Sequence, residues 1–217
     1  MLTFAEEILL LILDDKSGKL DMTSLKELHF ILAGAVLMDL ADRDKIDNDL
    51  EKLIVTDSSA TGIKLLDPYL AMIAQSEETF NTRYWLNQIV EYGDEIKKEA
   101  LGMLIEKGIL KVEEKKILWV FGVRRYPTID DSQEKEVRHR ITDLLNSDDI
   151  PTPHDVVLVS LANTFKLFPS ILGSDEAERL APRIAQIAKL DLIGQAVSQL
   201  LNRLYEDRLN FYMYLPY

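Results

Sequence analysis

The chain has 217 residues, of which 47% are hydrophobic and 29% are charged, a composition ordinary for a soluble globular protein. It has no cysteine, which excludes disulfides, thiolate metal sites and cysteine nucleophiles and fits a reducing cytoplasm. Its formal net charge of -12 argues against nucleic acid as a partner and against non-specific adsorption to anionic membranes, because both depend on cations that meet phosphates.

The first segment, Leu2–Asp15, predicts a helix that is buried on every side. Thr3 and Glu6 have the spacing of a capping box, in which a hydroxyl and a carboxylate satisfy backbone donors at the start of a helix. The block Ile8–Leu13 that follows has no polar face, which is typical of a core helix. The block is too short to span a bilayer, and the segment lacks the basic leader of a secretory signal.

The next elements expected in chain order are a helix over 24–43, a hairpin over 45–56, a loop over 58–62 and a short helix from 67. Ser24 and Glu27 repeat the capping-box spacing, and the small residues of this helix would let another helix approach closely. Asp67 is expected to cap the short helix, with Pro68 at its first position, where the missing N–H costs nothing.

The middle of the chain predicts helices over 82–90 and 94–108, an interruption near Gly93, a left-handed C-cap at Gly108 and a hairpin over 109–121. A C-terminal glycine is favoured at such a cap because it has no Cβ to clash. In the hairpin, two apolar runs are expected to flank a charged turn at Glu113–Lys116, the usual pattern of antiparallel strands joined by a polar turn.

Further helices are expected over 132–146, 153–167, 175–189 and 191–210, with Pro182 either kinking the third or marking its start. The expected fold class is therefore mainly α, a single compact helical domain over 1–217 with one or two small β-hairpins. Residues 209–217 form an aromatic C-terminal tail, which either docks on the domain's own groove or serves an interface.

Several sequence blocks appear in a fixed order along the chain. They are LTFAEEILLLILDD at 2–15, LAGAVLMDLADRDKI at 32–46, VTDSSATGIKLLD at 55–67, LIEKGILKVEEKKILWVF at 104–121 and RYP at 125–127. Together they resemble the Golgi phosphoprotein 3 family, which includes the yeast Golgi adaptor and bacterial relatives, over roughly residues 2–200. The absence of a long acidic leader and the short connection between Trp85 and Lys97 resemble the bacterial form.

This resemblance implies a mostly helical, non-enzymatic domain without a cofactor. Eukaryotic members of the family bind phosphatidylinositol 4-phosphate in a basic pocket built from one tryptophan and three arginines, and they hold the cytosolic tails of Golgi glycosyltransferases. By position, the tryptophan falls near Met22 and Thr23, and the arginines fall on Ala33, Asp94 and Lys97. One cation of three is kept, so we expect weak or absent binding of this lipid, because phosphate recognition depends on charged, often bidentate donors.

Lys97, Lys98 and Lys26 are the candidate ligands for an anionic lipid headgroup. They would form a replacement basic cluster if Lys26 faces the same pocket as the other two. The alternative interpretation is three solvated lysines on the surface.

The hairpin carries the candidate interface residues Ile117, Leu118, Trp119 and Phe121. The run from Ile117 to Phe121 is continuously apolar, and alternate residues of a strand face opposite sides. Such a strand needs cover on both faces, either from the core of its own domain or from another chain. A homo-oligomer through the hairpin is therefore one of the expected partnerships.

Other function classes find little support in the residues. His29, His139 and His154 lie on separate expected helices without metal-ligand spacing, and we interpret them as surface or helix-face residues. No P-loop, dinucleotide-binding glycine motif or nucleophile elbow is present. The helix before the hairpin has more acidic than basic residues, which disfavours a winged-helix DNA reader.

The leading hypothesis from sequence is a non-enzymatic peripheral membrane binding module. By family resemblance it would recognise a phosphoinositide or other anionic lipid headgroup, membrane-protein tails, or both, at the cytoplasmic face of a membrane. The alternative is a soluble protein–protein adaptor that has lost phosphoinositide binding. The substituted pocket arginines and the negative net charge favour this alternative.

Overall fold

The computed structural model describes residues 2–14, 19–20, 25–48, 51–117, 121–197 and 199, with backbone only over 114–117 and 121–124. The helices are α1 (Phe4–Ile12), α2 (Leu25–Asp42), α3 (Asp67–Ala74), α4 (Thr82–Ile89), the 3-10 helix η1 (Val90–Tyr92), α5 (Gly93–Glu106), α6 (Ser132–Asn146), α7 (Pro153–Thr164), α8 (Phe168–Leu172) and α9 (Ser174–Ala188). The strands are β1 (Ile46–Asn48), β2 (Leu53–Val55), β3 (Glu113–Ile117) and β4 (Phe121–Arg125). A further helical stretch covers 192–197.

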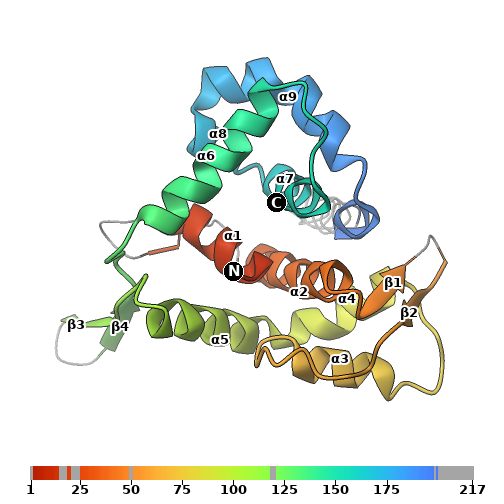
Figure 1. The fold of residues 1–217 in the computed structure, drawn as a ribbon. Helices are drawn as coiled ribbons and strands as arrows, with labels where there is room; N and C mark the ends of the chain where they lie inside the picture. The colour runs from red at the N-terminus through yellow and green to blue at the C-terminus, as the bar shows by residue number, and fades with distance from the viewer. Residues whose placement is uncertain are drawn as a thin grey trace, which may run out of the picture.

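Helices α1 and α2 form the centre of the molecule. Figure 1 shows them between two groups of elements, with α3, α4 and α5 on one side and α6 to α9 on the other. Contacts between elements agree, because α1 packs against α2, α5, α6 and α7, and α2 packs against α4, α5 and α7. The mainly α fold class with small hairpins is confirmed.

Helix α1 begins and packs as its sequence predicts. The capping box is present, with the Glu6 carboxylate 2.8 Å from Thr3 N and the Thr3 hydroxyl 3.3 Å from Glu6 N. Every residue of Ile8–Leu13 is buried, none more than 5% exposed. Glu6 and Glu7 are buried as well. The apolar pattern of the sequence did not predict their burial.

Helix α2 accepts a close neighbour through its small residues, as expected. A Cβ placed on Gly34 would lie 2.8 Å from Val197 Cγ2, in the helical stretch 192–197. That distance is shorter than side chains tolerate, so a glycine at this position lets the two helices touch. The capping box expected at Ser24 lies outside the described residues, and Leu25 is the first described residue of α2.

The first hairpin is confirmed, and the second is shifted in register. Strands β1 and β2 pair antiparallel, with Ile46 opposite Val55. In the second hairpin, Glu113–Ile117 is strand β3 itself, so the charged turn predicted at Glu113–Lys116 is wrong. The physical reason is cross-strand pairing, because the register sets Glu113 and Glu114 opposite the two arginines at the end of β4, and opposite charges favour such positions.

The shifted register also changes the meaning of the apolar run. Ile117 ends β3 and Phe121 begins β4, and these two residues are paired, so Ile117–Phe121 is not one strand as predicted. Leu118 and Trp119 lie outside the described residues. The predicted role of these hairpin residues in an interface stays a prediction.

The short helix α3 begins where expected but is capped differently. Pro68 lies in its first turn, whereas the N-cap position is Leu66, which makes no side-chain cap. Asp67 does not cap the helix. Its carboxylate accepts hydrogen bonds from the Thr61 amide (2.7 Å) and hydroxyl (2.6 Å), which lower the pKa of Asp67 and tie the preceding loop to α3.

The C-terminal half follows the expected helices with two changes. The helix expected over 153–167 ends at Thr164, and a separate short helix, α8, follows it. Pro182 lies inside α9, which starts at Ser174, so it does not mark a helix start. Gly108 has the positive φ expected of a C-cap, 75°. The aromatic tail over 209–217 lies outside the described residues.

Candidate functional site

Of the predicted headgroup residues, Lys26 lies in α2, and Lys97 and Lys98 lie in α5; the starts of these two helices meet. His29 of α2 packs against Gly93, the first residue of α5, so closely that a Cβ on Gly93 would lie 2.1 Å from His29 Cγ. No side chain other than hydrogen fits there. The interruption predicted near Gly93 is therefore a contact point, where η1 gives way to α5.

Asp94 joins the two helices at this point. Its Oδ1 atom lies 2.5 Å from Lys97 Nζ, one turn along α5, and 3.5 Å from His29 Nε2. The hydrogen bond from Lys97 is the main cause that lowers the pKa of Asp94. The Asp94 side chain is 62% exposed, so water screens much of this attraction.

Lys98 and Lys26 complete the predicted set. Both side chains are exposed, and neither has an ion pair within the described ranges. Lys26 lies three residues before His29 on α2, and residues at this spacing share a helix face. His29 contacts the start of α5, and the grouping of Lys26 with Lys97 and Lys98 stays a prediction.

The position of one family arginine is closed in this chain. Ala33, which holds that position, is 0% exposed and lies inside the core face of α2. A cation at this site would have to extend out of the core to reach a ligand. The described cationic candidates are therefore the three lysines, and Lys97 shares its charge with Asp94.

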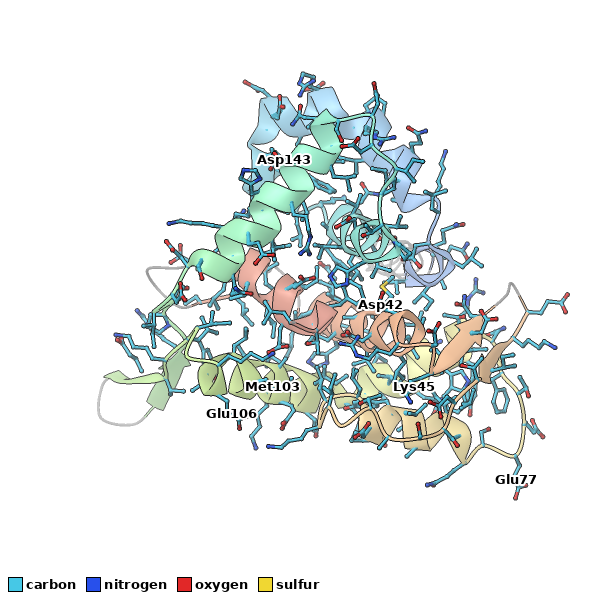
Figure 2. The ribbon with its side chains drawn as sticks, viewed as in Figure 1. Asp42, Lys45, Glu77, Met103, Glu106 and Asp143 are labelled. Atoms are coloured by element: carbon cyan, nitrogen blue, oxygen red, sulfur yellow. The ribbon has the colours of Figure 1, made fainter. Side chains whose placement is uncertain are left out.

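A second acid–cation cluster lies inside the molecule and was missed by sequence reasoning. The buried Glu7 of α1 accepts hydrogen bonds from Arg140 of α6 (2.9 Å) and contacts His154 of α7 (3.0 Å). The imidazole of His154 stacks on Phe4 at 4.3 Å. Its Nδ1 lies 3.8 Å from Asp42 of α2, which Figure 2 shows between α2 and α7.

This buried cluster contradicts the interpretation of His154 as a surface residue. Its side chain is 17% exposed, and it sits among charged groups of three other helices. Burial opposes its charge, yet the bond and the charge of Glu7 raise the pKa of His154 overall. The cluster holds α1, α6 and α7 together. Each charged group of the cluster has an opposite charge within 4 Å, so we assign it to the fold rather than to ligand binding.

The described residues were also searched for metal sites and for helices that could span a membrane. Among them, no group of three or more histidine and acidic side chains could hold a metal ion. No helix in the described ranges is long and apolar enough to span a bilayer.

The fold is that of a mostly helical domain in which α2 and α5 meet at His29 and Gly93. A family model described as Golgi phosphoprotein 3 (GPP34) matches residues 4–204. The chain belongs to this family. It is 32% identical over 171 residues to vacuolar protein sorting-associated protein 74 of Eremothecium gossypii, covering 66% of this chain and 49% of that protein.

A second relative gives the same result. Vacuolar protein sorting-associated protein 74 of Schizosaccharomyces pombe is 30% identical over 167 residues, which cover 67% of this chain and 49% of that protein. The match spans about half the length of both relatives. The resemblance drawn from the ordered sequence blocks is confirmed.

Proposed function

We propose that this chain is a non-enzymatic, peripheral membrane binding module whose cationic junction meets an anionic lipid headgroup such as a phosphoinositide. The observation that carries the proposal is the contact of His29 with Gly93, which brings the helix of Lys26 against the start of the helix that carries Lys97 and Lys98. In this proposal the three lysines lie around that junction. Membership of the GPP34 family supports a membrane-associated adaptor role, including the binding of membrane-protein tails.

The electrostatic attraction of this site to an anionic membrane surface is expected to be modest. Each lysine near an anionic membrane surface contributes about 1 kcal/mol, and the effect falls within a Debye length. Asp94 reduces the contribution of Lys97 by pairing with it. We therefore expect binding that is measurable at low salt and weak at physiological salt.

The second candidate is a protein–protein adaptor that does not bind phosphoinositides. It is favoured by one specific observation, the pairing of Lys97 with Asp94 where the family resemblance implies two arginines. In this case the chain would hold a protein tail through another surface. The two candidates differ in whether lipid binding depends on the junction lysines.

Co-sedimentation with vesicles separates them. The intact chain and a Lys26→Gln, Lys97→Gln, Lys98→Gln variant are compared on phosphatidylcholine vesicles with and without phosphatidylinositol 4-phosphate, across a salt series. Lys64→Gln with Lys135→Gln is the control, because both side chains are more than 70% exposed outside the junction.

The proposal expects the intact chain to favour the phosphoinositide vesicles and the junction variant to lose about fivefold or more in binding. The control should lose much less. Equal binding by the junction variant and the control would overturn the headgroup site. No association of the intact chain at any salt would favour the protein adaptor.

A further inference from the structure

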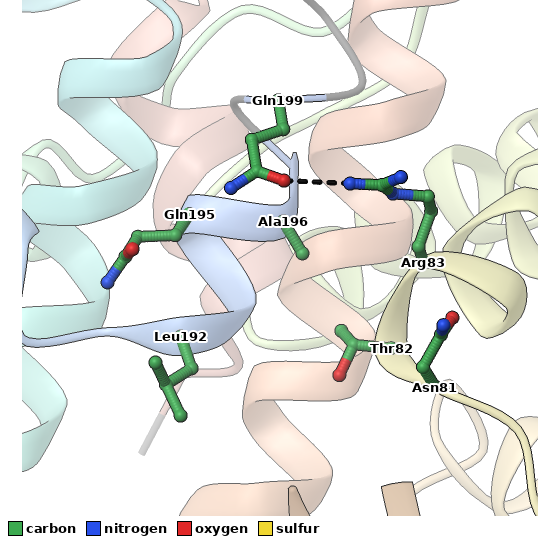
Figure 3. Close-up of a pocket in the computed structure, with 7 residues that line it drawn as sticks. All are labelled: Asn81, Thr82, Arg83, Leu192, Gln195, Ala196 and Gln199. Carbon is green, nitrogen blue, oxygen red and sulfur yellow. Dashed lines mark hydrogen bonds between the residues drawn. The ribbon is translucent and has the colours of Figure 1, made fainter. Parts of the chain in front are cut away.

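A separate pocket lies between the start of α4 and the helical stretch that follows α9. Its volume is about 270 Å³. On one side stand Asn81, Thr82 and Arg83, and on the other stand Gln195 and Gln199; Figure 3 shows these side chains around the gap between the two elements. The pocket lies below the usual size of sites for drug-sized ligands, so it fits a small molecule or the end group of a larger one.

One wall of the pocket holds a polar group without a partner. Thr82 is 6% exposed, and its hydroxyl has no hydrogen bond within the part of the chain that the structure describes. Figure 3 shows its side chain directed into the space between the helices. Buried polar atoms are nearly always paired, and leaving one unpaired costs about 1–3 kcal/mol.

The groups around Thr82 are hydrogen-bond donors. Arg83 uses one terminal nitrogen to bond Gln199 Oε1 at 2.8 Å, which leaves its remaining N–H groups for a ligand. Asn81 caps α4 through its oxygen, 3.0 Å from Tyr84 N, so its amide nitrogen is left to donate. The first intrahelical bond runs from Trp85 N to Asn81 O, and the amides before it belong to the positive end of α4.

The charge of the pocket also favours an anion. None of its described lining residues is acidic, although the whole chain has a net charge of -12. The single charged side chain among the lining residues is Arg83. A guanidinium together with hydroxyl and amide donors at a helix N-terminus is a donor set that suits an oxyanion.

We propose that this pocket binds a phosphate group. Arg83 and the first amides of α4 lie on one wall, and Gln199 lies on the other, so a group with several oxygens, such as phosphate, could be bonded from both walls. The phosphate could belong to a soluble phosphomonoester or to a lipid headgroup. Helix α4 and η1 separate Thr82 from Asp94, so this site is distinct from the junction of the lysines.

The test is a titration of the intact chain with inorganic phosphate at constant ionic strength. Calorimetry measures the binding, and thermal unfolding measures the melting temperature. Two variants probe the pocket. Arg83→Gln removes the cation and should weaken phosphate binding about tenfold or more. Thr82→Val removes a hydroxyl that has no described partner, so it should weaken phosphate binding about three- to tenfold without lowering the melting temperature in the absence of phosphate.

Two further variants serve as controls. Lys64→Gln removes one exposed charge elsewhere and should leave phosphate binding unchanged. The Lys26, Lys97, Lys98 triple glutamine variant should also keep it, which distinguishes failure of this pocket from failure of the proposed headgroup site. Absence of phosphate binding by the intact chain, or equal binding by Arg83→Gln and Lys64→Gln, would overturn the proposal.

Vesicles identify the source of the phosphate. If Arg83→Gln lowers co-sedimentation with phosphatidic acid vesicles, and inorganic phosphate competes, the pocket accepts a lipid headgroup. If Arg83→Gln loses inorganic phosphate but binds those vesicles as the intact chain does, the ligand is a soluble phosphate compound. Both results support the phosphate site.

Discussion

Two clusters in this protein combine an acid, a cation and a histidine, and they differ mainly in burial. In the core, Glu7 meets Arg140 and His154, and the Glu7 side chain is 4% exposed. At the junction of α2 and α5, Asp94 meets Lys97 and His29, and the Asp94 side chain is 62% exposed. Similar chemical groups thus hold helices together in the core in one place and remain exposed to water in the other.

The difference follows from the cost of removing charge from water. The block Ile8–Leu13 is apolar on every side, so burial of α1 carries Glu7 inward, where an unpaired carboxylate would be strongly unfavourable. Arg140 and His154 offset that cost with bonds near 3 Å. Asp94 pays no comparable desolvation, and water and salt screen its attraction to Lys97.

The largest expected effect comes from Glu7→Ala. It would leave Arg140 and His154 partly buried without their shared acid, and removal of one partner of a buried ion pair costs about 3–5 kcal/mol. The measurement is the free energy of unfolding from urea titration. The matched variant Asp94→Ala should change it by less than about 1 kcal/mol. Similar values for both variants would remove the distinction between the clusters.

The pH dependence of stability should carry opposite signs in the two regions. Burial raises the pKa of Asp39, beside Phe4 and Arg43, to about 7 from an unfolded value of 3.8. The folded state therefore holds a proton that the unfolded state has lost between about pH 4 and 7, so this contribution to stability falls as pH rises. The pKa of Asp94 is lowered, so its contribution is lost as pH falls.

The Asp39→Asn variant isolates the first of these contributions. The stability difference between the intact chain and Asp39→Asn should fall from pH 4 to pH 7, with a slope of up to about 1.4 kcal/mol per pH unit. Urea titrations at several pH values measure it. A difference that is flat or rises with pH would show that Asp39 is ionised in the folded protein throughout this range.

The contact between His29 of α2 and Gly93 of α5 can be tested directly by substitution. In Gly93→Ala, the added Cβ would lie 2.1 Å from His29 Cγ, and such overpacking typically costs about 1–3 kcal/mol. Gly102→Ala is the matched control on the same helix, because a Cβ there meets nothing within 4 Å. Since alanine favours helix, the control should stabilise by about 0.5–1 kcal/mol. Equal melting temperatures for both variants would show that α2 and α5 do not meet closely at Gly93.

The features predicted correctly from sequence depend on residues that are close together in the chain. The burial of α1 and its capping box follow from residues within a few positions of each other, and so does the left-handed Gly108. The grouping of Lys26 with Lys97 and Lys98 stays a prediction, because it depends on how α2 packs on α5 and not on neighbouring residues.

The missed features depend on distant partners. Glu7 lies 133 residues from Arg140 and 147 residues from His154, so no local pattern shows that they meet. The second hairpin was placed in the wrong register because its charged segment looks like a turn by itself. Only the arginines at the end of β4 make that segment a favourable strand. Arg83 and Gln199, which are 116 residues apart, escaped notice in the same way.

The smallest expected effect on stability comes from Asp94→Asn. This variant also tests whether Lys97 can bind a lipid headgroup once its acidic partner is removed. The substitution keeps the size of the side chain but removes the charge that pairs with Lys97. Stability should change by less than about 0.5 kcal/mol, because an exposed ion pair contributes little. Association with phosphatidylinositol 4-phosphate vesicles should rise about threefold to fivefold, since one lysine near the surface is worth about 1 kcal/mol, and added salt should reduce the gain. Asp143→Asn, which removes an exposed charge paired with His139 on α6, is the control for net charge. If both variants raise vesicle binding equally, the gain reflects the overall charge of the protein, and the junction has no special role in meeting the membrane.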